Sequence, residues 1–338
     1  MTKPLPHDAV LEPAGTRTLD RRRFLLQLGI LAGVGALPVV AGRSRERGAT
    51  RLEIARPALG TWVRVVVEED DGARGTRAVE AAFAAIRTVD LQMSVHREDS
   101  QVTRINAAAG QGSVHVDAAV QDVVERACAG ARATSGLYDP TILPLMKLYG
   151  FYGTGRDRYP TDREISAALE RTGHRHVVID RAAGTIGIAR SGVAIDLGSI
   201  GKGYALDRAI DAIREHGVRS ALVDVGGNVY GLGSPSGHPE GWTVGVLHPV
   251  TGRVDRTFTL RDRAVATSGN AEQSRVLGGR RVGHLLDARR GRPADGPLSV
   301  SVEAENGTDS DRLSTTAFLL GPGRFTGFPG ALRTHFIG

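Results

Sequence analysis

The stretch DLGSIGKGYALD, residues 196–207, says most about how this chain folds. It opens with Asp196, carries Lys202 between two of its glycines, and runs into apolar residues at helical spacing. Glycines let backbone amides approach an anion closely, and the N-terminus of a following helix favours negative charge. The stretch predicts a turn into a helix that can bind phosphate. A glycine-rich turn with a surface lysine and no ligand gives the same pattern.

Strands and helices are predicted on both sides of this turn. Alternation around Val63, Val65 and Val67 predicts a strand, and helical spacing predicts a helix over 76–91. The stretch 93–106, MSVHREDSQVTRIN, is expected to be a loop. Further helices are expected at 117–136, 203–217 and 309–320, with strands at 177–180, 185–188, 221–225, 242–247, 257–260 and 298–303. Because these elements show no regular βαβ repetition, the fold class expected is α+β.

The N-terminal residues 1–41 have the features of a twin-arginine-type export signal. Arg21, Arg22 and Arg23 precede an apolar run over 24–40, and small residues follow at 41–42. An exported protein is therefore expected, in the periplasm or on the outer face of the cytoplasmic membrane. An uncleaved membrane anchor is the alternative, because the run approaches the length that spans a bilayer. Residues 42–51 are expected to be a linker and 52–338 the folded domain.

Composition narrows the classes of function. Hydrophobic residues are 41% and charged residues 24% of the 338, which is ordinary for a globular protein. The formal charge of +6 falls to +4 without residues 1–41, so nucleic acid is not an expected partner. The single cysteine, Cys128, excludes an internal disulfide and a thiolate metal site.

A second chemical segment is TDSDRLSTTAFLLG, residues 308–321. In a helix, Asp311 and Thr315 lie four residues apart and share a face. A carboxylate and a hydroxyl are hard oxygen ligands suited to Mg²⁺, with substrate phosphates completing its coordination. The alternative is that Asp309 or Asp311 caps the N-terminus of this helix.

Four other segments carry polar groups at predicted turns. AVATSGN (264–270) ends a strand in hydroxyls and amides, and HLLDARRGRP (284–293) offers His284 and Asp287 as candidate general bases. A lone histidine is, however, more often structural. The remaining two, SGLYDPTILPLMKLYGF (135–151) and DVGGN (224–228), contain sharp or tight turns that also occur as plain architecture.

In this order, and together with LGT (59–61), these segments resemble the ApbE family, the FAD:protein FMN transferases, over about residues 57–321. The resemblance implies one domain of two lobes with FAD between them. It further implies Mg²⁺ ligands at Asp311, Ser314, Thr315 and the carbonyl of Ser199. The FAD contacts that it implies are Leu59, His96, Leu137, Tyr138, Asp139, Asp196, Lys202, Thr267, Ser268, Gly269 and His284.

The reaction implied by the resemblance is attack of a Ser or Thr hydroxyl on the FMN-side phosphorus of FAD, with AMP leaving. Lys202 would stabilise the pyrophosphate or the departing AMP, and His284 or Asp287 would accept the proton. The acceptor implied is an exported protein with an Asp-x-x-(Ser/Thr)-Gly-Ala-Thr-like motif. A membrane contact would come only from an uncleaved leader or a membrane-bound acceptor. Two alternatives remain at this stage: an FAD pyrophosphatase that yields FMN and AMP, and an exported FAD-binding protein without catalysis.

The sequence also departs from the family pattern. Leu59 replaces a usual Met, His96 a usual aromatic ring, and Ala271 a usual Tyr. The triplet 288–290, Ala-Arg-Arg, replaces Pro-x-Thr. Only seventeen residues follow Gly321, so the family's final strands are expected to be trimmed.

Overall fold

The computed structural model describes the backbone of residues 40–46, 49–153, 155–270 and 273–338, and side chains from Thr50 onward. These residues form one compact unit. Most of the predicted export signal lies outside them, as does Ala271. Among the residues described, no helix is long and apolar enough to cross a membrane.

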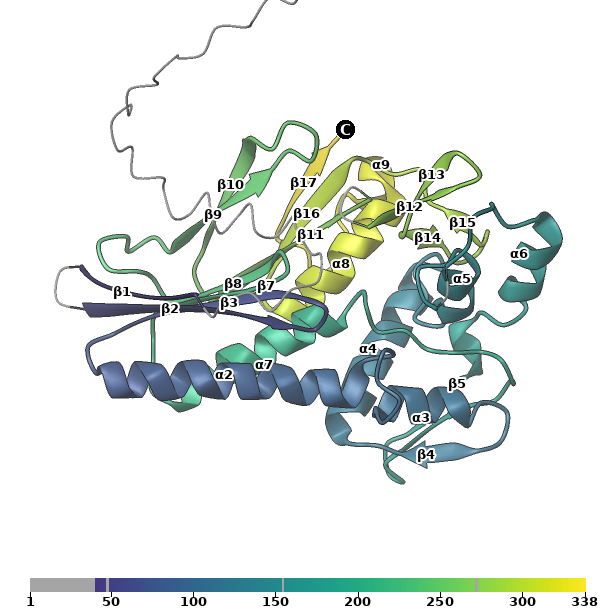
Figure 1. Cartoon of the computed structure of the whole chain (residues 1–338), viewed down its shortest axis with the longest axis horizontal. Coiled ribbons are helices and arrows are strands. Elements are labelled where there is room, and N and C mark those ends of the chain that lie inside the picture. The colour runs from purple at the N-terminus through teal and green to yellow at the C-terminus, as the bar shows by residue number, and fades with distance from the viewer. Residues whose placement is uncertain (1–39, 47–48, 154, 271–272) are drawn as a thin grey trace, which may run out of the picture. The chain divides into compact units, whose positions relative to one another are not determined.

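An eight-stranded antiparallel sheet is the framework (Figure 1). Its strands, in spatial order, are β1 (Val40–Glu46), β2 (Ala49–Ala58), β3 (Thr61–Glu69), β7 (Ala221–Val225), β8 (Asn228–Leu232), β11 (Arg263–Gly269), β16 (Ser299–Ala304) and β17 (Arg333–Ile337). The predicted alternation in β3 is confirmed, because Val63, Val65 and Val67 join the large core while Val66 joins a second core on the opposite face.

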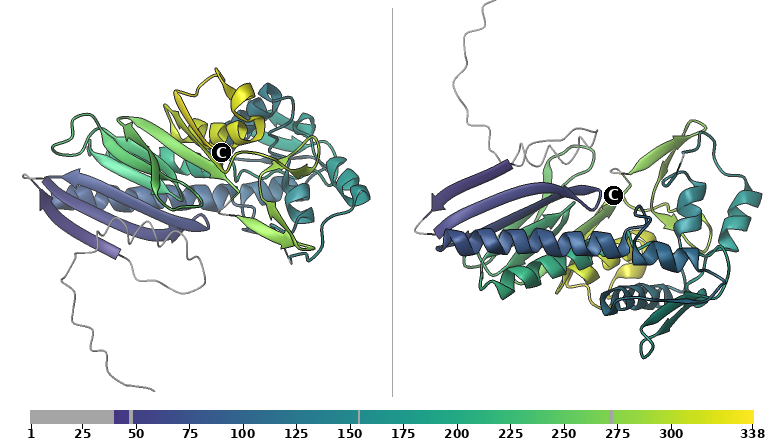
Figure 2. Two further views of the ribbon diagram at one scale, coloured as in Figure 1. Left: turned by 90° about the horizontal axis from the view of Figure 1, so that it is seen from above. Right: turned by 60° about the horizontal axis from the view of Figure 1, so that its bottom comes forward.

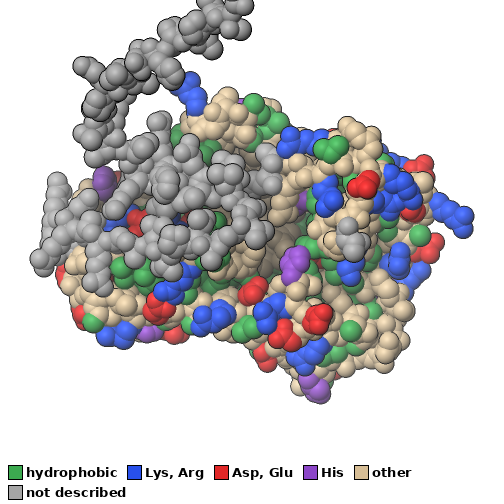
Figure 3. Space-filling model, in the orientation of Figure 1, with side chains coloured by type: hydrophobic (Ala, Val, Ile, Leu, Met, Phe, Trp, Pro, Cys, Tyr) green, Lys and Arg blue, Asp and Glu red, His purple; other side chains and the backbone are tan. Residues whose placement is uncertain are grey.

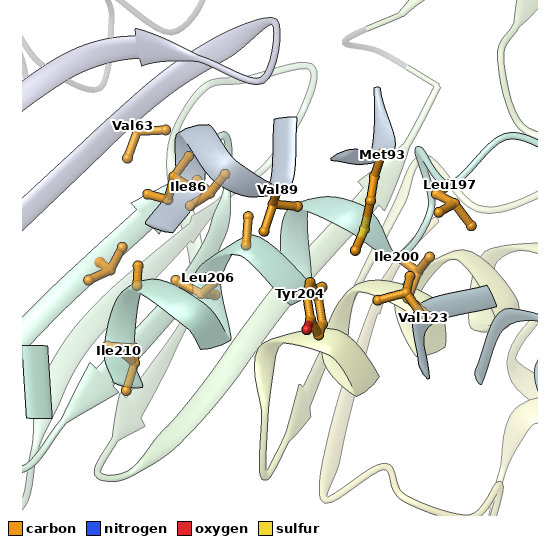
Figure 4. Close-up of a cluster of buried hydrophobic side chains, with 14 of the residues drawn as sticks. Val63, Ile86, Val89, Met93, Val123, Leu197, Ile200, Tyr204, Leu206 and Ile210 are labelled. Carbon is orange, nitrogen blue, oxygen red and sulfur yellow. The ribbon is translucent and has the colours of Figure 1, made fainter. Parts of the chain in front are cut away.

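Three helices cover one face of the sheet: α2 (Gly72–Met93), α7 (Gly201–Glu215) and α8 (Gly307–Leu320). Figure 4 shows part of the core under α2 and α7, to which Ile86 and Val89 of α2 and Leu206 and Ile210 of α7 contribute. Burying apolar surface of this kind contributes about 25 cal/mol per Å². The hairpin of β9 (Trp242–Leu247) and β10 (Val254–Leu260) packs on the other face.

A second group of elements lies beyond one end of the sheet (Figure 2). It contains α3 (Gln101–Ala107), β4 (Ser113–His115), α4 (Ala118–Ala133), α5 (Leu143–Leu148), α6 (Asp162–Leu169), the 3₁₀ turn His174–His176, β5 (Val177–Asp180), β6 (Thr185–Ile188), β12 (Ser274–Leu277), β13 (Arg280–Gly283), β14 (Leu286–Asp287) and β15 (Arg292–Pro293). The short helix α9 (Pro322–Phe325) follows α8. The α+β class is confirmed, with helices and strands mixed in one domain.

Three local expectations differ from the structure. The stretch 93–106 contains α3, because Ser100 caps a helix whose Val102 and Ile105 are buried. Of the residues expected as a linker at 42–51, residues 42–46 and 49–51 belong instead to paired strands, β1 and the start of β2. The short C-terminus still supplies a final strand, since β17 pairs with β16.

Candidate functional site

Two turns and one strand end lie at the same end of the main sheet. They are the β2–β3 turn at Leu59 and Gly60, the β7–β8 turn at Gly226 and Gly227, and the end of β11. The β7–β8 turn meets the start of β3, because the Gly226 N–H donates to the carbonyl of Trp62 at 3.1 Å. Leu59 has φ +53°, a left-handed conformation that is strained for a leucine. Strain of this kind concentrates at functional sites.

The glycine-rich turn enters α7 as predicted, and α7 crosses α8 at very close range. A Cβ atom on Gly203 would lie 2.1 Å from the carbonyl oxygen of Gly307, so only glycine fits there. At the crossing the Gly203 N–H donates to Asp311 Oδ2 at 2.9 Å. In return, the Gly307 N–H donates to Asp207 Oδ1 at 2.6 Å. Each helix therefore offers a carboxylate to the first backbone amides of the other.

Hard oxygen atoms of α8 face two neighbours, with Asp311 toward the start of α7 and Ser314 and Thr315 toward β11. Asp311, Ser314 and Thr315 are all buried. The Ser268 hydroxyl lies 2.8 Å from that of Ser314 and 3.3 Å from that of Thr315. The predicted sharing of one helix face is thus confirmed. The capping alternative for Asp309 and Asp311 is wrong, because Asn306 caps α8 by accepting from the Asp309 N–H.

Lys202 brings positive charge to this oxygen cluster. Its Nζ lies 3.7 Å from Asp311 Oδ1 and donates to the Gly198 carbonyl at 3.3 Å. The Ser199 carbonyl would accept the Gly203 N–H in a regular helix, but that N–H turns to Asp311, which leaves the carbonyl available to another partner. Carboxylate, hydroxyl and carbonyl oxygens are the donor set that Mg²⁺ prefers. The residues present therefore fit a magnesium ion with phosphates beside it.

His284 is prepared to accept a proton. Its Nδ1 lies 3.1 Å from the carbonyl oxygen of Gln273, which can only accept, so Nδ1 carries the proton and Nε2 keeps a lone pair. The pKa of His284 is lowered to about 4, chiefly by burial; the hydrogen bond to the Gln273 carbonyl opposes this shift, and the positive charge of Lys202 adds to it. The imidazole is consequently neutral at pH 7, as a general base must be.

Asp287 has a different environment. Its Oδ1 accepts the backbone N–H groups of Arg289 and Arg290 at 2.9 and 3.3 Å, and Arg289 Nε lies 3.5 Å away. The carboxylate thus organises its own turn. Of the two candidate bases, the geometry favours His284.

Asp196 belongs to a buried polar chain beside the glycine-rich turn. It accepts from the Gly198 N–H at 2.8 Å and from the Tyr152 hydroxyl at 2.9 Å. Burial raises the pKa of Asp196, while these two hydrogen bonds lower it. The Tyr152 ring lies 4.9 Å from that of His96, centroid to centroid. His96 and Asp196 are therefore brought together as expected, through a residue that the sequence analysis did not single out.

The turn at 137–139 is tied to the site by one side chain and to the scaffold by another. Ser199 donates to the buried hydroxyl of Tyr138 at 3.0 Å, and burial raises the pKa of that tyrosine. The Asp139 carboxylate accepts two hydrogen bonds from Thr141 and two from His174, at 2.6 to 2.9 Å. Asp139 thus fastens the turn to the residues at 174. Leu137, which precedes both residues, is buried.

Neighbouring residues of β11 divide between its two faces. Ser268 turns toward α8, whereas the Thr267 hydroxyl lies 2.7 Å from that of Ser301 on the neighbouring strand. Gly269 has no room for a side chain, since its Cβ would lie 2.8 Å from the Leu298 carbonyl oxygen. The structure thus places Ser268, and not Thr267, among the α8 oxygens.

Two polar residues of the candidate site, Tyr152 and Asn228, were not identified from the sequence. Tyr152 follows the 135–151 segment, and its aromatic ring in a glycine-rich loop was the available signal. Asn228, the last residue of DVGGN, is 2% exposed, and its Nδ2 has no hydrogen-bond partner within the described ranges. A buried amide of this kind is a rare exception in folded proteins.

Comparison with known proteins agrees with this geometry. The sequence model of the ApbE family matches residues 59–329. FAD:protein FMN transferases from Treponema pallidum and Klebsiella pneumoniae are 33% and 34% identical to the chain, covering 86% and 78% of it and 83% and 80% of their own lengths.

Two solved structures are also similar. The crystal structure of the ApbE protein of Thermotoga maritima has a TM-score of 0.77 at 35% identity, covering 85% of this chain and 94% of its own. The flavin transferase ApbE of Vibrio cholerae has a TM-score of 0.75 at 25% identity, covering 86% and 98%. With a family match that spans more than half of its length, the chain belongs to the ApbE family.

Proposed function

We propose that this chain transfers the FMN moiety of FAD to a Ser or Thr hydroxyl of an acceptor protein and releases AMP. The observation that carries the proposal is the buried oxygen cluster of Asp311, Ser314 and Thr315 facing Lys202 at the start of α7. A cationic helix N-terminus beside hard oxygen ligands suits a pyrophosphate and its magnesium ion. The names of the relatives, FAD:protein FMN transferase, support the same activity.

In this proposal the chain binds FAD by its pyrophosphate. Lys202 and the first amides of α7 take the negative charge, which the helix dipole also favours. Mg²⁺ would be held by Asp311, Ser314, Thr315 and the Ser199 carbonyl. When bound, the ion would neutralise charge on the phosphate oxygens. The strained β2–β3 turn at Leu59 and the His96 ring lie at positions where the family resemblance implies contact with FAD.

The chemical step needs a proton acceptor near the incoming hydroxyl. His284 Nε2 takes the hydroxyl proton as the hydroxyl oxygen bonds to the FMN-side phosphorus. The bond from that phosphorus to the AMP oxygen breaks, and AMP leaves with the electron pair. Lys202 stabilises the charge that develops on the leaving phosphate, and His284 then loses its proton to water.

The cellular setting is part of the proposal. The twin-arginine-type leader over 1–41 supports export. We therefore place the reaction in the periplasm or on the outer face of the cytoplasmic membrane, with an exported acceptor that bears an Asp-x-x-(Ser/Thr)-Gly-Ala-Thr-like motif.

The test is AMP release from FAD and Mg²⁺, with and without an acceptor domain that bears this motif. Asp311→Asn is expected to abolish release. Asp309→Asn is the matched control, because its carboxylate pairs with Arg312 on another face of α8. Release that needs the acceptor supports the transferase. Equal release without it identifies an FAD pyrophosphatase, and tight FAD binding with no AMP identifies a carrier.

A further inference from the structure

Positive charge is concentrated around His284. The segment 273–295, here called the arginine segment, holds six arginines and two aspartates, which is +4 of the chain's formal +6. The arginines are Arg275, Arg280, Arg281, Arg289, Arg290 and Arg292. Figure 3 shows Lys and Arg side chains gathered over the part of the molecule that carries α6 and β12–β15. So short a segment with most of the net charge makes a local basic face.

The β12–β13 hairpin carries three of these arginines, Arg275, Arg280 and Arg281. Leu277 of β12 and Val282 of β13 are buried in a core with Tyr149. The register pairs Val276 with Arg281, and alternation turns both away from that core. Val276 is 67% exposed. The hairpin therefore holds an apolar side chain and a guanidinium side by side on its outer surface.

Most of the arginine segment lacks internal counter-charges. Arg292 pairs with Asp162 at 2.7 Å, and Arg289 with Asp287 at 3.5 Å. Across the part of the chain that the structure describes, no carboxylate lies within 4.0 Å of four others: Arg275, Arg280, Arg281 and Arg290. By contrast, the neighbouring arginines at 156 and 158 share Glu164. Arg275 is the least available of the four, because its Nε is buried. Arg280 stacks on the Tyr159 ring at 5.0 Å, and Arg281 Nε donates to the Ser274 hydroxyl at 3.0 Å. Arg280, Arg281 and Arg290 are nevertheless exposed residues, and their charge is available to an external anion.

A groove lies between Arg280 and Arg281 on one side and Asp295 on the other, next to the residue that precedes His284. Its volume is about 250 Å³, and its lining includes Asn270, Ser274, Arg280, Arg281 and Gly283. Gly283 precedes His284, and Asn270 accepts from the Leu285 N–H at 3.3 Å. The groove therefore borders both chain segments that hold His284 in place.

We propose that the arginine segment docks an acidic stretch of the acceptor protein next to the hydroxyl that receives FMN. The inference rests on the proposed function. A hydroxyl that gives its proton to His284 must come within about 3 Å of Nε2. The polypeptide on either side of that hydroxyl must then pass over the residues that flank His284, which are the arginines. Complementary charge at such a surface speeds encounter and fixes orientation.

The test uses charge reversal in the full chain. Arg280→Glu with Arg281→Glu is compared with Arg253→Glu and Arg256→Glu, two exposed arginines on the β9–β10 hairpin over the other face of the sheet. We expect the first pair to lower kcat/KM for the acceptor about tenfold or more, mainly through KM, and to flatten its salt dependence. The dissociation constant of FAD should not change, and the control pair should behave as wild type.

A complementary acceptor makes the test specific. Acceptor domains whose Asp and Glu residues near the modified hydroxyl become Lys should recover activity with the Arg280→Glu, Arg281→Glu chain. Equal losses in both variant pairs, or a matching loss of FAD affinity, would overturn the docking proposal. The proposal would also be overturned if the Arg280→Glu, Arg281→Glu chain bound phosphatidylglycerol vesicles more weakly than wild type but reacted with the acceptor as wild type does. Binding of the acceptor should also be measured without FAD. This measurement tests docking independently of the proposed function, because it can be made even if wild type transfers no FMN.

Discussion

The α7–α8 crossing makes a sharp prediction for Gly203→Ala. The added Cβ would lie 2.1 Å from the Gly307 carbonyl oxygen and 2.7 Å from Asp311 Cβ. Ordinary contacts begin near 3.4 Å, so the helices must separate by more than 1 Å. Separation breaks the hydrogen bond from Gly203 to Asp311 and moves the Asp311 carboxylate away from Lys202.

The expected cost follows from three contributions. Overpacking a close contact costs about 1–3 kcal/mol. Losing a hydrogen bond to a charged group costs about 1.5–3 kcal/mol. Alanine regains about 1 kcal/mol over glycine within a helix. The net loss is about 1.5–5 kcal/mol, which lowers Tm by about 3–10 °C at roughly 2 °C per kcal/mol for a domain of this size.

The assay is thermal unfolding of Gly203→Ala beside Gly201→Ala. Gly201 lies two residues earlier in α7, and its Cβ would have only Leu197 Cβ, at 3.9 Å, within contact range. That control should be neutral or slightly stabilising. Equal Tm values for wild type, Gly203→Ala and Gly201→Ala would show that the two helices do not meet as described.

Three further predictions concern single side chains. The folded pKa of His284, about 4, lies below the ordinary 6.5, so its neutral form stabilises the fold above pH 6.5 and this contribution is lost as the pH falls toward 4. Between pH 7 and pH 4, the free energy of unfolding measured in urea should therefore fall by up to about 3 kcal/mol less in His284→Gln than in wild type. Equal decreases in the two proteins would contradict the burial of the His284 side chain. Thr315→Val should raise the Mg²⁺ concentration for half-maximal AMP release about tenfold or more. Thr316→Val is the control and should leave that concentration unchanged, because the Thr316 hydroxyl donates to the Arg312 carbonyl. The same Mg²⁺ dependence in both variants would show that Thr315 is not a metal ligand. Lys202→Gln should weaken FAD binding about tenfold in fluorescence titration and reduce its salt dependence, and unchanged binding would exclude contact with the pyrophosphate.

Local patterns predicted the elements that hold the site. The glycines of 196–207 and the Asp311 to Thr315 spacing each depend on nearby residues alone, and the structure places both as expected. The β3 alternation succeeded for the same reason, because one face of the strand packs against helices and the other against a hairpin.

Long-range contacts were the part that sequence could not supply. Nothing near Gly203 indicates that Gly307 lies against it, about a hundred residues later. The sequence does not show that the Asp139 carboxylate accepts hydrogen bonds from His174 and Thr141, which occupy its oxygen atoms in the structure. The helix α3 was missed because it is only seven residues long and its stability comes from a cap and two buried side chains.

The proposed function requires that α7 and α8 together hold FAD for transfer to a protein hydroxyl. The most direct measurement is the intact mass of an acceptor domain after incubation with FAD, Mg²⁺ and the full chain, beside a sample containing Asp311→Asn. We expect the acceptor to gain the mass of one FMN minus water with wild type and no mass with the variant. The gain should be lost when the acceptor Ser or Thr becomes Ala. An acceptor of unchanged mass in the wild-type sample, with FAD intact, would contradict the proposed function.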